Sequence, residues 1–321
     1  MKKPNPIIYK YLEDYPNTAH LTLAKKIYKE YPTKFTNIEH IRSLIRYYRG
    51  QAGNDNRKDA KKHIDYLAKL KSELPKGETE KVEPYYLPKD RKKVLIISDI
   101  HLPYHDDKAL FAALEYGLKE DVDTIYINGD LLDFALISKH ENNTTKHSVK
   151  YELDCAKIFL KGLREMFPKA LIIYKYGNHD LRFDKWIRLK APELLDIEHI
   201  NLAEILGLNE LSIIQLDNLQ WAYMWDIAVL HGHELPMKSG GINPARTARL
   251  SVNRPLIIGH FHRQSKDAGM ILGKPHYYAY SSGCLCDLTP AYLPINNWVH
   301  GFILINEGQV YQKEIINGRV I

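Results

Sequence analysis

The chain has 321 residues, of which 45% are hydrophobic, 26% charged and 11% aromatic. This composition excludes a disordered or collagen-like chain and allows one or two globular domains with a sizeable core. The formal net charge of +6 is uneven, since residues 1–93 hold 22 Lys and Arg against 12 Asp and Glu, a net charge of +10. Residues 94–321 hold 23 against 27, a net charge of −4, so the basic charge belongs to the N-terminal quarter.

The sequence shows no membrane anchor and no secretory signal. The first residues, MKKPNP, lead into no apolar stretch, and no apolar run approaches the ~20 residues that span a bilayer. The three cysteines, Cys155, Cys284 and Cys286, form no even disulfide set and lack the Cys/His spacing of a zinc site. We therefore expect reduced, structural thiols in a cytoplasmic protein that has no membrane partner.

Two helices joined by a short turn are predicted near the N-terminus. In the first, apolar residues recur at helical spacing from Leu21 to Tyr28, after Asn17 or Thr18 as the N-terminal cap. The second follows Asn37 as its cap and has an apolar face opposite three basic residues, Arg42, Arg46 and Arg49. Such a pair is typical of a helix-turn-helix, so these arginines are candidate nucleic-acid contacts. A solvated helical appendage or an oligomerisation element is the alternative.

The composition further along the chain sets the domain boundaries. A third helix is predicted over residues 59–74, where apolar residues again recur at helical spacing. Residues 76–92 are rich in Lys, Glu and Pro without such a period, so we predict a linker there. The chain thus divides into a basic helical domain over residues 1–75, this linker, and a second domain over residues 93–321. Nucleic acid is the partner that we expect for the first domain.

The second domain begins with alternating strands and helices and ends with strands alone. Apolar runs predict strands over 94–97, 124–128 and 170–175, separated by helices over 108–120 and 148–167. This alternation predicts a largely parallel sheet. A second, mostly antiparallel or mixed sheet is predicted from short strands over 212–216, 220–224, 227–230, 256–258, 276–280, 302–305 and 310–316.

Five short motifs each follow the end of a predicted strand: Asp99-Ile100-His101, Gly129-Asp130, Gly177-Asn178-His179-Asp180, His231-Gly232-His233 and Gly259-His260-Phe261-His262. Strand ends at one sheet edge are neighbours in space, so one pocket can collect all five motifs. Glycine precedes the functional residue in three of the motifs, as expected where the backbone turns sharply beside a ligand. Carboxylate, imidazole and amide donors without thiolate suit Mn²⁺, Fe²⁺ or Zn²⁺. Seven such donors are too many for one ion and fit two ions ~3.5–4 Å apart, which is the arrangement that clamps a phosphoryl group.

In this order the motifs closely resemble those of the calcineurin-like metallophosphoesterases, over roughly half of the chain. The resemblance implies an α/β fold, a four-layer αββα metallophosphoesterase sandwich, here with a small N-terminal all-α domain. It implies that Asp99, His101 and His262 bind one ion and that Asn178, His231 and His260 bind the other, with Asp130 bridging. A hydroxide between the ions would attack phosphorus. His179 would protonate the leaving oxygen or stabilise the transition state, and Asp133 would orient His179.

The resemblance also narrows the substrate. Serine/threonine protein phosphatases of this family have arginine and glutamate where this chain has Phe134 and Asp180, and the motifs look more like those of phosphodiesterases and repair nucleases. We predict a phosphodiesterase or nuclease that uses Mn²⁺, with Fe²⁺ or Zn²⁺ as alternatives. Asp180 is predicted to cap the helix that starts at Leu181. Further candidate substrate contacts are His233, Lys238 and Arg246.

Two other functions stay open. The first is a phosphomonoesterase or small cyclic-nucleotide phosphodiesterase, whose N-terminal domain would act in assembly or localisation. The second is a non-catalytic binding module on the same scaffold. We rank the module last because none of the expected metal ligands is substituted.

Overall fold

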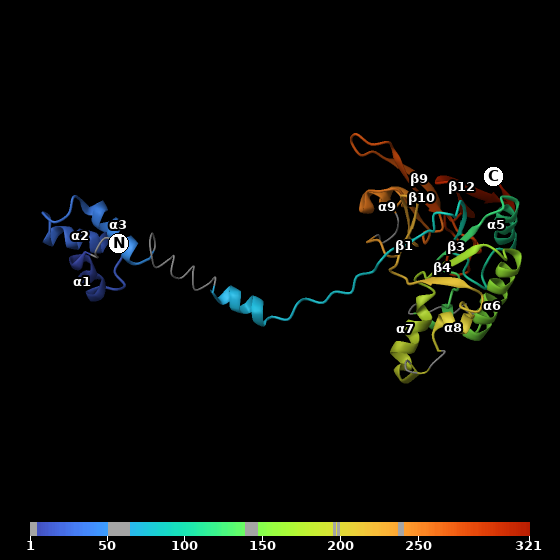
Figure 1. Ribbon diagram of the computed structural model, residues 1–321, viewed down its shortest axis with the longest axis horizontal. Helices are drawn as coiled ribbons and strands as arrows, with labels where there is room; N and C mark the ends of the chain where they lie inside the picture. The colour runs from blue at the N-terminus through green and yellow to red at the C-terminus, as the bar shows by residue number, and fades with distance from the viewer. Residues whose placement is uncertain (1–4, 51–64, 139–146, 195–196, 198–199, 237–240) are drawn as a thin grey trace. The chain divides into compact units, whose positions relative to one another are not determined.

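The computed structural model of the chain describes residues 5–50, 65–138, 147–194, 197, 200–236 and 241–321 (Figure 1). Residues 59–64 of the predicted third helix, and Lys238, lie outside these ranges. The chain forms two compact units, Met1–Glu80 and Lys81–Ile321. Among the described residues, no helix is both long and apolar enough to cross a membrane.

The N-terminal unit is built within its described part on α1 (Pro6–Asp14), α2 (His20–Glu30) and α3 (Ile38–Tyr48). Their apolar faces form one core that includes Ile8, Leu23, Ile27, Ile41 and Ile45. The sequence patterns above do not predict α1, although its start carries two signals. Asn5 accepts hydrogen bonds from the backbone N–H groups of Ile7 and Ile8, and Pro6 occupies the first helical position.

One predicted helix cap in this unit is confirmed and another is wrong. Asn37 Oδ1 accepts from the backbone N–H of His40 at 2.7 Å, as predicted for α3. Neither Asn17 nor Thr18 caps α2, which begins after Ala19, a residue whose side chain has no oxygen to offer. The final part of the predicted third helix, residues 65–73, is helical and exposed throughout.

The second unit contains two sheets. Among the described residues, a seven-stranded sheet has the order β13-β12-β11-β2-β3-β4-β5 and a six-stranded sheet has the order β1-β6-β7-β8-β10-β9. The strands are β1 (Tyr85–Tyr86), β2 (Lys93–Ile97), β3 (Thr124–Asn128), β4 (Leu171–Lys175), β5 (Ile213–Leu216), β6 (Ala222–Met224), β7 (Ile227–Val229), β8 (Leu256–Ile258), β9 (Gln264–Gly269), β10 (Tyr277–Ser282), β11 (Gly301–Asn306), β12 (Gln309–Ile316) and β13 (Arg319–Val320). The helices are α5 (Asp107–Lys119), α6 (Val149–Met166), α7 (Leu181–Lys190), α8 (Leu202–Leu206) and α9 (Pro244–Val252), with short 3₁₀ turns η1 (Ala135–Ile137) and η2 (Pro192–Leu194).

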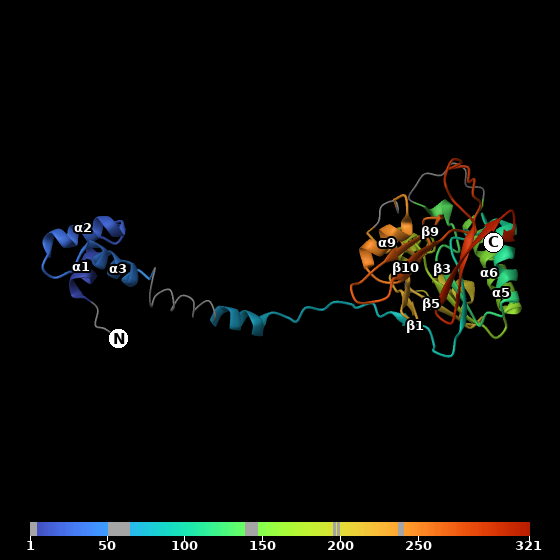
Figure 2. The same cartoon turned by 90° about the horizontal axis from the view of Figure 1, so that it is seen from above.

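Alternating side chains of the strands create three layers of core and therefore four layers of structure. In β2, Leu95 and Ile97 pack with α5, α6 and α8, whereas Val94 and Ile96 face the second sheet. The outer face of that sheet packs on α9 through Ala245 and other small residues. Figure 2 shows α9 on one side of the sheets and α5 and α6 on the other. The predicted αββα sandwich is confirmed.

The mixed character of the second sheet is also confirmed, but three strands predicted for it belong to the first sheet. These are β5, β11 and β12. β11 pairs antiparallel with β2 through Ile303 and Ile96. Residues 301–305 are buried throughout, but so are β7 and β8 of the second sheet, so the apolar run predicts a buried strand and not the sheet that it joins. Tyr85 and Tyr86, within the predicted linker, pair with β6 as an edge strand.

Candidate metal centre

The ends of parallel strands bring the five motifs together. β2, β3 and β4 are parallel neighbours, so the loops after them leave the same edge of the first sheet. β7 and β8 are parallel neighbours in the second sheet and supply the remaining two loops. Five motif residues adopt left-handed backbone conformations, with φ between 53° and 67°: Asp99, His101, Asp130, His260 and His262. Such conformations cost about 1–3 kcal/mol each in non-glycine residues and gather at functional sites.

Two glycines of the motifs leave space that a side chain would fill. A Cβ atom at Gly177 would overlap Asp130 Oδ1, and one at Gly259 would overlap the Ser98 hydroxyl and approach Asp99 Oδ2 to 2.7 Å. Ser98 in turn donates a hydrogen bond to Asp99. These glycines are therefore required by the close approach of carboxylates to the backbone, as the sequence predicts.

The first group of donor atoms consists of Asp99, His101 and His262, all buried. His262 Nε2 lies 3.2 Å from Asp99 Oδ1 and 3.2 Å from His101 Nε2. Two imidazole nitrogens that face each other at this distance can share a proton or a cation. The composition and spacing of the group fit one divalent ion.

The second group consists of Asp130, His231 and His260. Asp130 Oδ2 lies 3.1 Å from His231 Nε2 and 3.9 Å from His101 Nε2, so this oxygen reaches toward both groups. Asn178 Oδ1 is a buried acceptor that has no hydrogen-bond partner in the described part of the chain. A buried amide oxygen without a donor is costly, and a cation would satisfy it. The donors therefore fit two divalent ions, with Asp130 between them.

Buried imidazoles and carboxylates compensate each other at this centre. Burial would raise the pKa of Asp99, but the nearby His262 and His231 lower it to about 2. Burial would lower the pKa of His231, but Asp130 and Asp99 raise it to about 10. At neutral pH His231 consequently holds a proton that a metal ion would displace on binding.

Hydrogen bonds to the far side of the ring fix how two of the imidazoles, His231 and His101, face the centre. His231 Nδ1 lies 2.6 Å from the carbonyl oxygen of Asn128, so this nitrogen donates and Nε2 points at Asp130. His101 Nδ1 lies 2.9 Å from Asp133 Oδ1, which leaves its Nε2 for the first group. Such outer partners set the tautomer and orientation of metal-binding histidines.

His179 lies beside the donors and is held from both sides. Its Nδ1 is 3.0 Å from both Asp133 Oδ1 and the Asp133 carbonyl oxygen, and its Nε2 is 3.0 Å from the Arg182 guanidinium. Burial would raise the pKa of Asp133, but hydrogen bonds from His101 and His179 hold it well below its usual range. Asp133 is therefore an anion that orients two imidazoles at once.

The prediction that Asp180 caps α7 is wrong. Its backbone is already helical and its side chain makes no cap bond. The carboxylate instead turns inward and accepts from the backbone N–H groups of Asp130, Leu132 and Gly177 and from the Tyr174 hydroxyl. The side chain thus ties the loop after β3 to the loop after β4.

Two of the three further substrate candidates, His233 and Arg246, lie in the described part of the chain and have different surroundings. Both ring nitrogens of His233 are buried without a hydrogen-bond partner among the described residues, and burial lowers its pKa to about 4. Its ring centre lies 5.3 Å from that of His231, so a neutral His233 lies next to the donors. Arg246 is exposed on α9 and lines neither of the two cavities that border the centre.

The three candidate nucleic-acid contacts lie on α3 or at its end in the N-terminal unit. Arg46 is exposed, and Arg42 forms an exposed ion pair with Glu39 at 2.8 Å. Arg49 is engaged within the unit, because its guanidinium donates to the carbonyl oxygens of Thr18 and Tyr15 at 2.6 and 3.0 Å. Of the three arginines, only Arg42 and Arg46 present their charge outward.

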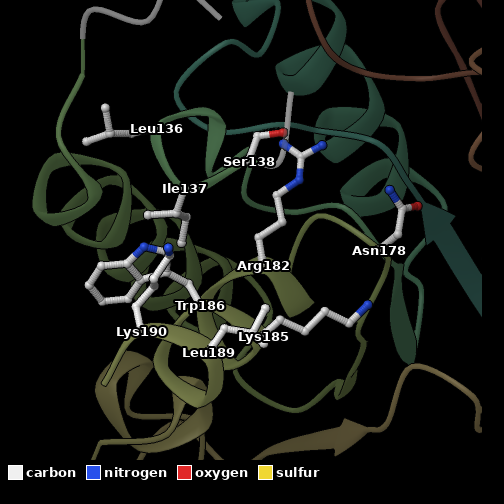
Figure 3. A pocket seen from close by; sticks show the side chains of 9 residues that line it. All are labelled: Leu136, Ile137, Ser138, Asn178, Arg182, Lys185, Trp186, Leu189 and Lys190. Atoms are coloured by element: carbon white, nitrogen blue, oxygen red, sulfur yellow. The ribbon is translucent and has the colours of Figure 1, made fainter. Parts of the chain in front are cut away.

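Two cavities border the donors. One, of about 330 Å³, is lined by His101 and Asp133 and by aromatic residues that the sequence patterns did not single out: Tyr104, His147, Tyr292 and Trp298. The other, of about 450 Å³, starts at Asn178 and runs along α7 past Arg182 and Trp186 (Figure 3). Arg182 could have been found from its position three residues after His179, in the first turn of the helix that starts at Leu181. Tyr292 and Trp298 lie in a segment without strand or helix and carry no such signal.

Comparisons with known proteins give a family match and several more distant likenesses. A sequence model described as calcineurin-like phosphoesterase matches residues 92–295. The gene 54 protein of Mycobacterium phage L5 is 26% identical over 249 residues, which cover 70% of this chain and 93% of the phage protein. The gene 54 protein of Mycobacterium phage D29 is 25% identical over 196 residues, covering 59% and 73%. Among solved structures, wild-type Vps29 of Entamoeba histolytica complexed with zinc shares 15% identity at a TM-score of 0.38, covering 71% of this chain and 96% of that one. The E. coli phosphoesterase YfcE shares 15% identity at a TM-score of 0.36, with the same coverage.

Proposed function

The chain belongs to the calcineurin-like phosphoesterase family and is a metal-dependent phosphoester hydrolase; on this premise we propose that it is a dinuclear phosphodiesterase that cleaves nucleic acid. The observation that carries the proposal is the pair of separate cavities that border the donor atoms. One adjoins His101 and Asp133, and the other adjoins Asn178. A phosphodiester has a substituent on each side of its phosphorus and needs two such spaces, whereas a monoester needs one.

The seven predicted ligands would hold two divalent ions, for which we propose Mn²⁺, with Asp130 between them. When bound, the ions supply an activated water and neutralise charge on the phosphoryl oxygens. Asp99, His101 and His262 would form one site, and Asn178, His231 and His260 the other. This assignment is supported by the unpartnered Asn178 Oδ1 and by the position of Asp130 Oδ2 between His231 and His101.

We assign to His179 the transfer of a proton to the leaving oxygen. Its Nδ1 is bonded to Asp133, so Nε2 is the nitrogen that can face substrate. Asp133 would orient the ring and balance its charge. In this structure Arg182 donates to Nε2 at 3.0 Å, so Nε2 would carry the proton only after the guanidinium turns from it to the phosphoryl group. There Arg182 would add a positive charge where the leaving oxygen becomes negative.

The N-terminal unit would hold the nucleic-acid backbone. Its support is the net charge of +7 on residues 1–80, which hold 17 Lys and Arg against 10 Asp and Glu, and the outward position of Arg42 and Arg46 on α3. Basic side chains that neutralise phosphates release counterions, so the binding would weaken steeply with salt. Because Arg49 is occupied within the unit, we propose no contact for it.

The activity is tested by assaying the full chain, with Mn²⁺ or with chelator, on four substrates. These are p-nitrophenyl phosphate, bis-p-nitrophenyl phosphate, a cyclic nucleotide and a labelled oligonucleotide. We expect Mn²⁺-dependent cleavage of the diester and the oligonucleotide, lowered by about 10²- to 10⁴-fold in kcat in His179→Gln at unchanged metal content. His276→Gln, a change at an exposed histidine, is the matched control. Monoester hydrolysis without diester hydrolysis would refute the proposal.

The role of the N-terminal unit is tested with Arg42→Gln/Arg46→Gln in the full chain. The slope of log affinity for duplex DNA against log salt should fall by about 0.9 for each phosphate that the variant no longer neutralises. Lys274→Gln/Arg319→Gln removes the same charge at exposed positions of the second unit and serves as the control. Equal slopes in the two double variants would exclude a specific role for α3.

A further inference from the structure

The cavity along α7 is lined by both basic and apolar side chains, a combination that hydrolysis of a phosphoester does not by itself require. Residues at helical spacing on α7 line one side of it: Arg182, Lys185, Trp186 and Leu189. Leu136, Ile137 and Ser138, in and just after η1, line the other side, and Asn178 lies at one end. Its volume of about 450 Å³ falls within the range of small-ligand sites. Figure 3 shows Lys185 extended toward the Asn178 end and the Trp186 indole beside Ile137.

The wall combines positive charge with exposed apolar surface. Trp186 is 41% exposed, and Leu136 and Leu189 are exposed as well. No Asp or Glu is among the described residues that line the cavity, and neither Lys185 nor Lys190 has a carboxylate partner in the described part of the chain. The cavity is therefore suited to a ligand that is both anionic and planar apolar. Nucleotides have that combination, because each base offers a flat face and each linkage a phosphate.

Arg182 connects this cavity to the proposed proton donor. Its guanidinium donates to the Asp133 carbonyl oxygen at 2.8 Å and lies 3.0 Å from His179 Nε2. Whatever occupies the cavity therefore lies beside the group that would protonate the leaving oxygen. With the role proposed for His179, the occupant would belong to the leaving side of the scissile bond.

We propose that the cavity along α7 binds the leaving nucleoside of a nucleic-acid strand, with its base stacked on Trp186 and the next phosphate facing Lys185. This inference rests on the proposed function. It adds to that function which side of the scissile bond the cavity binds and which residue binds the base. Stacking of this kind tolerates any base, since every base has a π-face, so the subsite selects nucleic acid over simple diesters without reading sequence.

The test uses the full-length protein with Mn²⁺ and three dinucleotides: TpT and two analogues, each lacking one of the two bases. The nucleoside released without phosphate identifies the leaving side. In the wild type, removal of the base on that side should raise KM about 5- to 100-fold, the range that one stacked base supplies. Trp186→Ala should raise KM for TpT by a similar factor. Its KM values for TpT and for the analogue that lacks the leaving-side base should then be equal. Trp186→Phe should restore most of the affinity.

Controls separate stacking from folding. Trp225→Ala removes a tryptophan of 42% exposure in the turn between β6 and β7 and should leave KM unchanged. The analogue that lacks the base on the leaving side has no ring to stack there, so the wild type and Trp186→Ala should hydrolyse this diester equally. An equal loss on this diester, or unchanged KM for TpT in a folded Trp186→Ala, would overturn the inference.

A binding measurement keeps the inference distinct from the proposed function. The chelated wild type, Trp225→Ala and Trp186→Ala are each titrated with TpT. Binding is detected by the quenching of tryptophan fluorescence in the wild type and Trp225→Ala. It is detected by calorimetry in Trp186→Ala, which lacks the reporting tryptophan. If the wild type cleaves no diester but binds TpT through Trp186, the proposed function fails and the subsite stands. If the wild type cleaves oligonucleotides and neither TpT binding nor KM depends on Trp186, the subsite fails and the function stands.

Discussion

The carboxylate of Asp180 accepts a hydrogen bond from the backbone N–H of Asp130 at 2.8 Å, across 50 residues of sequence. The same oxygen accepts from Gly177, and the other accepts from Leu132 and from the Tyr174 hydroxyl. One buried side chain thus holds the loop of the proposed bridging aspartate against the loop of Asn178 and His179. The relative position of the two proposed ion sites depends on this contact.

Replacement of Asp180 by asparagine should destabilise the protein. An amide keeps one acceptor oxygen, but its NH₂ group would face two donors, and each unsatisfied buried donor costs about 1–3 kcal/mol. We expect Asp180→Asn to lower the free energy of unfolding of the chelated protein by that amount or more, measured by urea denaturation. Asp226→Asn, the same change at an exposed position, should have little effect. Equal stability of the two variants would show that the Asp180 bonds contribute nothing net.

Local signals explain how much of this site the sequence could predict. The sequence could predict the strands and the proposed metal donors because apolar runs mark β2, β3 and β4, and the motif residues follow directly. The sequence could not predict the role of Asp180, because its partners are mostly backbone N–H groups. Every residue except proline carries such a group, and no sequence pattern marks it. Likewise the apolar run of β11 predicts burial, but burial alone does not say which sheet a strand joins.

Asn178 should matter for metal binding and should not support the folding of the metal-free chain. Its Oδ1 has no hydrogen bond in the described structure that a substitution could break, and its burial without a donor is costly. Asn178→Ala should therefore leave the free energy of unfolding of the chelated protein unchanged or raise it by up to about 1–3 kcal/mol. Mn²⁺ affinity, measured by calorimetry, should fall by more than about tenfold, because removal of even an outer-sphere partner costs that much.

Asn128 is the matched comparison for Asn178. Its Nδ2 donates to the buried carbonyl oxygen of Leu230 at 2.8 Å, so Asn128→Ala should destabilise the chelated protein by about 1–3 kcal/mol. It should still bind two Mn²⁺ ions per chain, because its side chain is not among the proposed donors. A destabilised Asn178→Ala with normal Mn²⁺ affinity would contradict the assignment of Asn178 as a ligand.

The buried ion pair of Lys175 and Glu234 should support the His231 loop. Lys175 Nζ lies 2.7 Å from Glu234 Oε1, and the Glu234 carboxylate accepts from the backbone N–H groups of His231 and Gly232. Lys175→Met would leave a buried carboxylate unpaired, which costs about 3–5 kcal/mol. The double variant Lys175→Met/Glu234→Gln should recover part of the stability, since a neutral amide still accepts from the loop.

A double-mutant cycle by urea denaturation measures the coupling within this pair. The comparison is the exposed pair of Lys161 and Glu165 on α6, at 3.9 Å, where coupling should be at most about 0.5 kcal/mol. If the buried pair shows coupling as small as the exposed one, Lys175 does not hold Glu234 in place.

Glu152 should make the stability of the protein depend on pH. Burial raises the pKa of this α6 carboxyl from 4.5 to about 8, and it accepts from the backbone N–H of Phe134 at 2.5 Å. Between these two values the folded state keeps a proton that the unfolded state releases, so stability falls as pH rises, by up to about 1.4 kcal/mol per pH unit. Glu152→Gln cannot titrate and still accepts from Phe134. Relative to the wild type, it should gain stability steadily from about pH 5 to about pH 8 in urea denaturation. For Glu165→Gln, a change at an exposed position of the same helix, the free energy of unfolding should depend on pH as it does in the wild type. If that of Glu152→Gln also runs parallel to the wild type, Glu152 is ionised in the folded protein.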